Sequence, residues 1–309
     1  MNQEPVVNAM SVARHRGGLR RWLWSLVFGL WTGTWAAEPL YVPQAEHVRG
    51  PVYAIVGPMG QRSAANAGLN ANYGFVIGRT GVILIDSGAS AYSAAMLHKA
   101  VQAVTDKPVR WVLNTGSQDH RWLGNAYFAQ QGAELQAMAA TAQTQQTFAA
   151  QQLANLARFV GHQLRGTVPV TAAVTHSGPE AQVEIDGVRV QWIETHAHYP
   201  GDAMIHLPAY GITFTGDLVY VDRLLSVLPQ SNVRMGLAAF ERLRALGPQR
   251  LVPGHGRVSD LAQAQRDTGD YYRFLIEQVG RAARDMEPMD ETLGRLARPA
   301  AFIHLQNFD

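Results

Sequence analysis

Residues 109–120 read VRWVLNTGSQDH, a short apolar run that leads into a carboxylate and an imidazole, Asp119 and His120. Four further apolar runs lead in the same way to a possible metal ligand. They are 82–85 before Asp86, 190–193 before His196 and His198, 212–214 before Asp217, and 251–253 before His255. Strands of an α/β sheet present the residues at their ends along one edge. The repeated pattern therefore predicts a single metal-binding edge.

The composition limits the chemistry of such a site. Of the 309 residues, 47% are apolar and 16% are charged, which is typical of a folded globular chain. The sequence contains no cysteine, so disulfides, thiolate nucleophiles and thiolate metal ligands are excluded. Any metal must be bound by His, Asp or Glu.

The N-terminal 36 residues differ from the rest of the chain. Four arginines between positions 14 and 21 precede the apolar run 22–31, and Thr34-Trp35-Ala36 places small residues before a cut at Ala37. This pattern predicts a signal peptide over 1–36 and a periplasmic or secreted protein, with no stable membrane span after cleavage. The alternative is an uncleaved N-terminal anchor.

Removal of this segment changes the charge of the chain. The segment contains four arginines and one glutamate, so the formal net charge of the remainder is −1 rather than +2. Nothing in the remainder indicates a surface for nucleic acid or another polyanion. We expect a small-molecule substrate.

Residues 37–309 are expected to form one domain. Strands are predicted at 53–56, 73–77, 82–85, 109–113, 170–174, 183–185 and 188–193, and helices at 91–104, 125–130, 141–164, 232–246 and 262–283. Tight turns at Gly81 and Gly187 indicate antiparallel hairpins. The predicted fold class is α/β, an αββα sandwich of two face-to-face mixed sheets with outer helices. A purely parallel α/β sheet is the alternative.

In the order and approximate spacing of these motifs, the chain resembles the metallo-β-lactamase superfamily from about residue 53 to residue 258. The resemblance implies a strand-end Asp at Asp86, an H-x-H-x-D-H motif at 115–120, a metal-ligating His at His198, a bridging carboxylate at Asp217 and a final ligand at His255. It also implies the αββα sandwich and a zinc-dependent hydrolase.

A narrower resemblance rests on residues 114–120, NTGSQDH, in a chain with an export signal. In this respect the sequence is similar to quinoprotein relay system zinc metallohydrolases, a branch related to periplasmic sulfur-oxidation hydrolases. That branch is associated with PQQ-dependent alcohol dehydrogenases. The resemblance implies a periplasmic quinoprotein dehydrogenase as a partner.

The chain departs from the superfamily at the first two histidines of H-x-H-x-D-H. Thr115 and Ser117 occupy these positions, or Gly116 if one residue is deleted. Neutral hydroxyls are poor zinc ligands compared with imidazole. The first of two zinc sites therefore loses two ligands and keeps only His198 and the shared Asp217.

The second site keeps its ligands, so we expect one zinc ion, bound by Asp119, His120 and His255 with Asp217 in reach. A second ion is expected only if His196 replaces a missing ligand. Residues i and i+2 of an extended segment point to the same side, which would bring His196 beside His198. The alternative is that His196 bonds a backbone carbonyl in a loop.

The ligand count favours hydrolytic chemistry, because an open coordination position leaves room for a water whose pKa zinc lowers toward about 7. Asp119 or Asp217 would orient this water or accept its proton. Asp86 is expected to orient a ligand from outside the ligand set. Residues 220–223, which include Tyr220, Asp222 and Arg223, form either a loop that selects substrate polarity or a solvated charge pair.

Three functions follow from these residues. The first is a secreted zinc-dependent hydrolase of a small acyl or ester substrate, accessory to a quinoprotein system. The second is a non-catalytic metal-binding partner or maturation factor of a quinoprotein, which the missing histidines favour. The third is a β-lactamase, for which single-metal catalysis would require a different activation of water.

Overall fold

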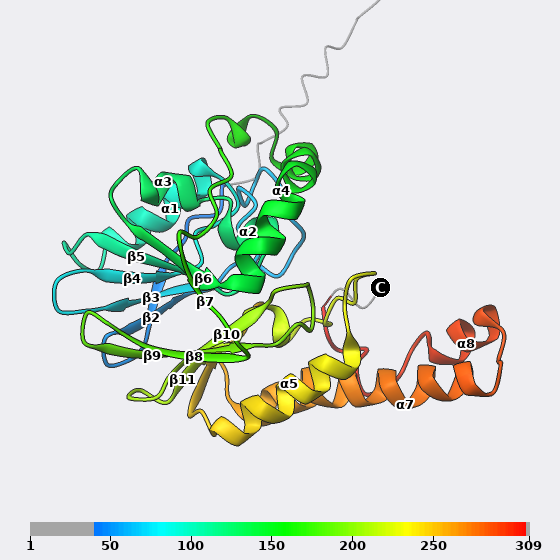
Figure 1. Cartoon of the computed structure of the whole chain (residues 1–309). Coiled ribbons are helices and arrows are strands. Elements are labelled where there is room, and N and C mark those ends of the chain that lie inside the picture. The colour runs from blue at the N-terminus through cyan, green and yellow to red at the C-terminus, as the bar shows by residue number, and fades with distance from the viewer. Residues whose placement is uncertain (1–39, 307–309) are drawn as a thin grey trace, which may run out of the picture. The chain divides into compact units, whose positions relative to one another are not determined.

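Two sheets lie face to face in the computed structural model, which describes residues 40–306 (Figure 1). The first has seven strands in sequential order, and the second has five in the order β12-β11-β10-β9-β8. The strands of the first sheet are β1 (Ala45–Arg49), β2 (Val52–Ile55), β3 (Tyr73–Ile77), β4 (Val82–Ile85), β5 (Val109–Asn114), β6 (Glu134–Met138) and β7 (Val174–His176). Those of the second are β8 (Glu180–Ile185), β9 (Val188–Glu194), β10 (Ala203–Leu207), β11 (Ile212–Phe214) and β12 (Arg250–Val252).

Both sheets are mixed, as the two glycine turns predict. The hairpin over 78–81 makes β3 and β4 antiparallel, and β4 to β7 then run parallel. In the second sheet the hairpin at Gly187 makes β8 and β9 antiparallel, and β12 is parallel to β11. The αββα sandwich is therefore confirmed, and the purely parallel alternative is wrong because tight hairpins can join only antiparallel strands.

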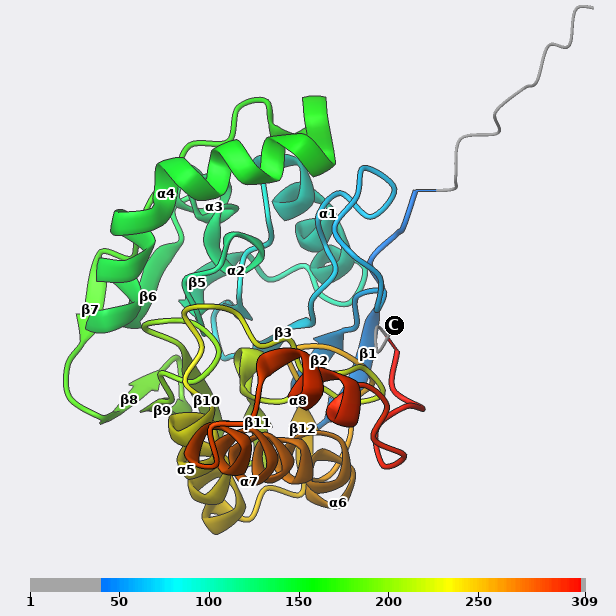
Figure 2. The ribbon, with the colours of Figure 1, turned by 90° about the vertical axis from the view of Figure 1, so that its right-hand side faces the viewer.

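Helices cover the outer side of each sheet (Figures 1 and 2). Those on the first sheet are α1 (Ala91–Gln102), α2 (Asp119–Trp122), α3 (Asn125–Ala129) and α4 (Ala139–Val160). The C-terminal part adds α5 (Val233–Leu246), α6 (Leu261–Ala264), α7 (Asp270–Arg284) and α8 (Met289–Leu296). None of the helices within 40–306 is long and apolar enough to cross a membrane.

Side chains from alternate positions of β4 separate two of the apolar cores. Leu84 belongs to the core that includes Leu97 of α1, whereas Ile83 belongs to the core that includes Trp192 and Phe214 of the second sheet. A third core lies between the second sheet and helices α5 and α7. Burial on both faces explains why this strand reads as a continuous apolar run.

Three predicted elements differ from the observed ones. The helix expected at 141–164 ends at Val160, because Gly161 has a φ of +53°, and Gly161–Leu164 form a 3-10 helix. The strand expected at 170–174 is instead Val174–His176, because pairing with β6 begins only at Val174. The helix expected at 262–283 is interrupted by a short π-helix, Gln265–Gly269. The predicted signal peptide, 1–36, lies outside the described residues.

Two side chains of this π-helix hold the loop at 220–223 in place. Thr268 Oγ1 donates to the carbonyl of Tyr220 at 2.6 Å, and Asp267 accepts from the backbone N–H of Asp222 at 2.8 Å. Both side chains that make these bonds are buried. Such turns occur often at functional sites.

The importance of the two-sided core can be tested with Leu84→Ala. Leu84 is fully buried, so its truncation is expected to lower the free energy of unfolding by about 2–5 kcal/mol. Leu293→Ala is the matched control, because Leu293 is 63% exposed and its loss should cost less than about 0.5 kcal/mol. Urea denaturation measures both, and equal losses would contradict this account of the core.

Candidate metal centre

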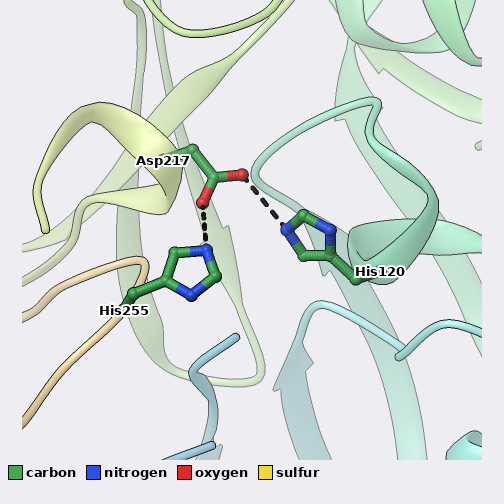
Figure 3. Close-up of side chains that lie close together, drawn as sticks. All are labelled: His120, Asp217 and His255. Atoms are coloured by element: carbon green, nitrogen blue, oxygen red, sulfur yellow. Dashed lines mark hydrogen bonds and ion pairs between the residues drawn. The ribbon is translucent and has the colours of Figure 1, made fainter. Parts of the chain in front are cut away.

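Three of the predicted ligands come together where strands of both sheets end. His120 lies in α2 after β5, Asp217 in the turn Gly216–Leu218 after β11, and His255 just after β12. Their ligand atoms all lie within 4.8 Å of one another, and all three side chains are buried (Figure 3). The structure thus assembles these three residues from distant parts of the sequence.

Asp217 is the centre of this cluster. Its two carboxylate oxygens lie 3.3 Å from His120 Nε2 and 3.3 Å from His255 Nε2 (Figure 3). Glycine is required beside it, because a Cβ on Gly254 would lie 2.7 Å from Asp217 Oδ1 and 2.5 Å from the carbonyl oxygen of Gly216. The Gly-His pair therefore permits the close approach of the two loops.

The charge states of the cluster suit a cation. Burial opposes ionisation of Asp217, but Arg121 and His120 outweigh it and hold the pKa of this carboxyl well below its usual range. Burial lowers the pKa of His255 to about 3, so its imidazole is neutral at neutral pH. An ionised carboxylate and a neutral imidazole are the forms that bind metals.

The outer nitrogens of the two histidines also have acceptors. His255 Nδ1 lies 2.7 Å from the carbonyl oxygen of Asn70, and His120 Nδ1 lies 3.2 Å from Asp119 Oδ1. A proton on each Nδ1 can be donated to these oxygens, which leaves both Nε2 lone pairs directed at the cluster. The residues therefore fit one divalent ion such as zinc, with Asp119 orienting His120 rather than binding the metal.

Two arginines contact the same outer nitrogens. Arg62 Nη2 lies beside His120 Nδ1, and Arg223 Nη1 lies 2.9 Å from His255 Nδ1. When an arginine donates to Nδ1, the histidine proton is on Nε2 and is donated to Asp217. In the tautomer that would bind a metal, Nδ1 carries the proton, so these arginines would then contact the imidazole without donating to Nδ1.

A third arginine, Arg121, is bonded to the ligand carboxylate itself. It donates through Nη2 to Asp217 Oδ1 at 2.6 Å and through Nη1 to Asp86 Oδ2 at 3.1 Å. It also donates to the carbonyl oxygens of Asn72 and Gly254. With a side chain only 2% exposed, Arg121 supplies a permanent positive charge behind the cluster.

The remaining predicted residues lie outside the cluster. Asp86 accepts from Arg121 and from the backbone and hydroxyl of Thr115, so it positions these groups and no ligand histidine. Asp119 is paired with Arg62 at 2.6 Å. His198 lines the same cavity as His120 and His255, but its Nε2 contacts Gln118.

His196 is not brought to the cluster. Its Nε2 lies 2.8 Å from Glu194, and its side chain is 34% exposed. The i, i+2 rule does not apply, because His196 has a φ of +47° and the backbone here is not extended. The partner is a carboxylate, so the alternative of a bond to a backbone carbonyl is also not observed.

A family model for the metallo-β-lactamase superfamily matches residues 67–255, more than half of the chain. The chain belongs to the metallo-β-lactamase superfamily. The match does not indicate the narrower quinoprotein-associated branch, which stays a prediction. A comparison with curated proteins finds no match for this superfamily member.

Solved structures share its fold. A metallo-β-lactamase from Pontibacter korlensis is 18% identical, with a TM-score of 0.60 over 75% of this chain and 99% of that one. The metallo-β-lactamase DIM-1 is 16% identical, with a TM-score of 0.58 over 76% and 98%. A double mutant of the sec-alkyl sulfatase PisA1 is 17% identical, with a TM-score of 0.63 over 82% of this chain and 45% of that one.

The place of the missing superfamily histidines, residues 115–117, is filled by internal hydrogen bonds. Thr115 bonds Asp86, and Ser117 Oγ donates to the carbonyl oxygen of Pro200 at 2.8 Å. Within residues 40–306 only one group of three possible ligands comes together. The geometry therefore supports one metal site in this superfamily member.

The single site predicts a stoichiometry. The protein is expected to bind about one zinc ion per chain, and His255→Ala and His120→Ala should lose it, because two ligands do not close a zinc site. His196→Ala is the matched control and should keep the ion. Mass spectrometry of metal content measures all four proteins, and two ions per chain, or loss in the control, would contradict the assignment.

Burial of His255 predicts a pH dependence in the metal-free protein. The unfolded imidazole takes up a proton near pH 6.5 and the folded one only near pH 3, so the unfolded state binds more protons between these values. The free energy of unfolding should fall as the pH drops below 6.5, by up to about 1.4 kcal/mol per pH unit from this group.

The measurement is urea denaturation at pH 7, 6 and 5 with a chelator present. His255→Gln removes the titrating group and should reduce the slope. The same slope in both proteins would show that His255 is not held neutral by burial.

Proposed function

We propose that this protein is a zinc-dependent hydrolase with a single catalytic ion and a small acyl or ester substrate. The observation that carries the proposal is the buried cluster of His120, Asp217 and His255, whose geometry and charge suit one ion. The cluster lies at a cavity of about 250 Å³, to which both histidines contribute. Bound zinc would supply the Lewis acidity that activates water and polarises a carbonyl.

The surrounding residues hold the ligands in place. Arg121 fixes Asp217, the carbonyl oxygen of Asn70 fixes His255, and Asp119 fixes His120. Burial would raise the pKa of Asp119, but Arg62 and His120 hold it well below its usual range. A carboxylate so firmly ionised is a weak proton acceptor, so we assign Asp119 and Asp217 to positioning and metal binding instead of proton transfer.

We further propose that the hydrolase is periplasmic or secreted and serves a quinoprotein dehydrogenase. Export is supported by the signal pattern in 1–36, and the partner by the resemblance of 114–120. β-Lactam hydrolysis is a second candidate, because structural relatives named metallo-β-lactamases are covered over 98–99% of their length.

The hydrolase is tested with zinc-loaded protein acting on p-nitrophenyl acetate and on nitrocefin. Hydrolysis of the ester is expected, with loss of activity in His255→Ala and after chelation and with retention in His196→Ala. Turnover of nitrocefin alone would favour the β-lactamase. Stoichiometric zinc binding with no turnover of either compound would favour the non-catalytic metal-binding partner.

A further inference from the structure

A second groove opens beside the cavity at the metal centre, along one side of α4. It has a volume of about 290 Å³ and shares Arg62 and Gln118 with that cavity. Asp119 belongs to the lining of the groove, and the adjacent His120 belongs to the lining of the cavity. A ligand in this second groove, called here the α4 groove, therefore lies next to any group held at the metal centre.

Side-chain carboxamides predominate in the α4 groove. Half of its ten lining residues are Gln or Asn, namely Gln118, Gln151, Gln152, Asn155 and Gln230. A carboxamide offers both N–H donors and an acceptor oxygen, and a hydroxyl group likewise donates and accepts. The lining thus matches a neutral ligand with several hydroxyl groups.

These carboxamides differ in whether their hydrogen bonds are already made. Gln152 is 8% exposed, donates to the carbonyl oxygen of Ser117 at 2.7 Å and accepts from Trp122 Nε1 at 2.9 Å. The side chains of Gln151 and Gln230 are exposed and form no hydrogen bond within residues 40–306. The buried side of the groove is therefore fixed, and its exposed side offers free donors and acceptors.

The charges of the α4 groove favour a neutral ligand. Arg62 and Asp119 form an ion pair at 2.6 Å, so their charges offset each other. Arg158 is exposed to water and donates to Asn155 Oδ1 at 2.6 Å. No other charged residue of the described chain lines the groove. A buried, unpaired charge that would need an ionic ligand is thus not part of this lining.

An exposed aromatic ring completes the α4 groove. Phe159 lies one helical turn after Asn155, and it is 51% exposed although its side chain is large and apolar. A sugar ring has a C–H face beside its hydroxyl groups, so it can pack on an aromatic ring and bond to carboxamides at the same time. A hydrocarbon chain would cover the carboxamides without pairing them, which is unfavourable.

We propose that the α4 groove binds the sugar or polyol part of an ester substrate whose acyl group lies at the metal centre. The inference deepens the proposed function, on which its role in substrate selection rests. In the reaction, the oxygen of water adds to the acyl carbon and the bond from that carbon to the sugar oxygen breaks. The sugar leaves with a proton as the free alcohol, and the other product is the carboxylic acid.

The substrate test compares 6-O-acetyl-D-glucose with ethyl acetate in zinc-loaded protein, each rate being divided by the rate of alkaline hydrolysis of the same ester. The corrected kcat/KM of the sugar ester should be at least about tenfold higher, because several neutral hydrogen bonds contribute. Gln151→Ala and Phe159→Leu should each lower it by about 2- to 10-fold, as expected for one hydrogen bond or one ring contact. Both variants should leave ethyl acetate nearly unchanged.

Two variants serve as controls. Gln146→Ala removes an exposed glutamine of α4 that does not line the groove, so it should change neither ester. Phe159→Tyr keeps the aromatic ring and should keep the preference for the sugar ester. A sugar preference that is absent in the wild type, or is equal in Gln151→Ala, Phe159→Leu and the wild type, would overturn the inference.

A binding test needs neither zinc nor turnover. Saturation-transfer NMR follows titration of the metal-free protein with methyl β-D-glucopyranoside and, separately, with N-acetylglycinamide. The glucoside should bind saturably, about 2- to 10-fold more weakly in Gln151→Ala and Phe159→Leu and equally in Gln146→Ala. No saturable binding of the glucoside by the wild type, or tighter binding of the amide, would contradict the sugar assignment.

The two tests together separate this inference from the proposed function. Glucoside binding that depends on Gln151 and Phe159, in a protein that hydrolyses neither ester, would refute the hydrolase and leave the sugar-binding groove. Hydrolysis of both esters with equal corrected kcat/KM would leave the hydrolase and overturn the role of the α4 groove.

Discussion

The guanidinium of Arg121 joins the ends of both sheets. It is bonded to Asp86 after β4 of the first sheet and to Asp217 after β11 of the second. It also donates to the carbonyl oxygens of Asn72, just before β3, and Gly254, just after β12. Because the side chain is buried, loss of any of these partners would leave an uncompensated charge in the interior. The edge where the sheets meet is therefore fixed in one arrangement, and the residues of the candidate metal centre lie on the same loops.

Much of the fold and of the ligand cluster could be predicted from the sequence. Apolar runs locate the strands, and the glycines at 81 and 187 specify hairpins that exclude a purely parallel sheet. The ligands His120, Asp217 and His255 each follow such a run, so their convergence depends only on strands ending at a common edge. These signals are local in sequence, and the tertiary structure only has to align the strand ends.

The remaining parts of the site depend on contacts that leave no local signal. The carboxylates that form ion pairs with Arg62 and Arg121 lie far from them in the sequence, and no spacing rule links an arginine to its partner. The hypothesis that His196 lies beside His198 depended on the rule for extended segments, which the positive φ of His196 excludes. The π-helix at 265–269 lies between two α-helical segments. The apolar pattern of the sequence predicts one continuous helix there and does not indicate the π-helix.

Arg62 and Arg121 come with the polypeptide, whereas a metal has to be acquired from the surroundings. The carboxylates Asp86, Asp119 and Asp217 are thus already paired with arginines of the same chain. Because these ion pairs are internal to the chain, they hold the loops of the candidate centre without a bound ion. Zinc, if bound as proposed, would then enter a site whose loops are already in place.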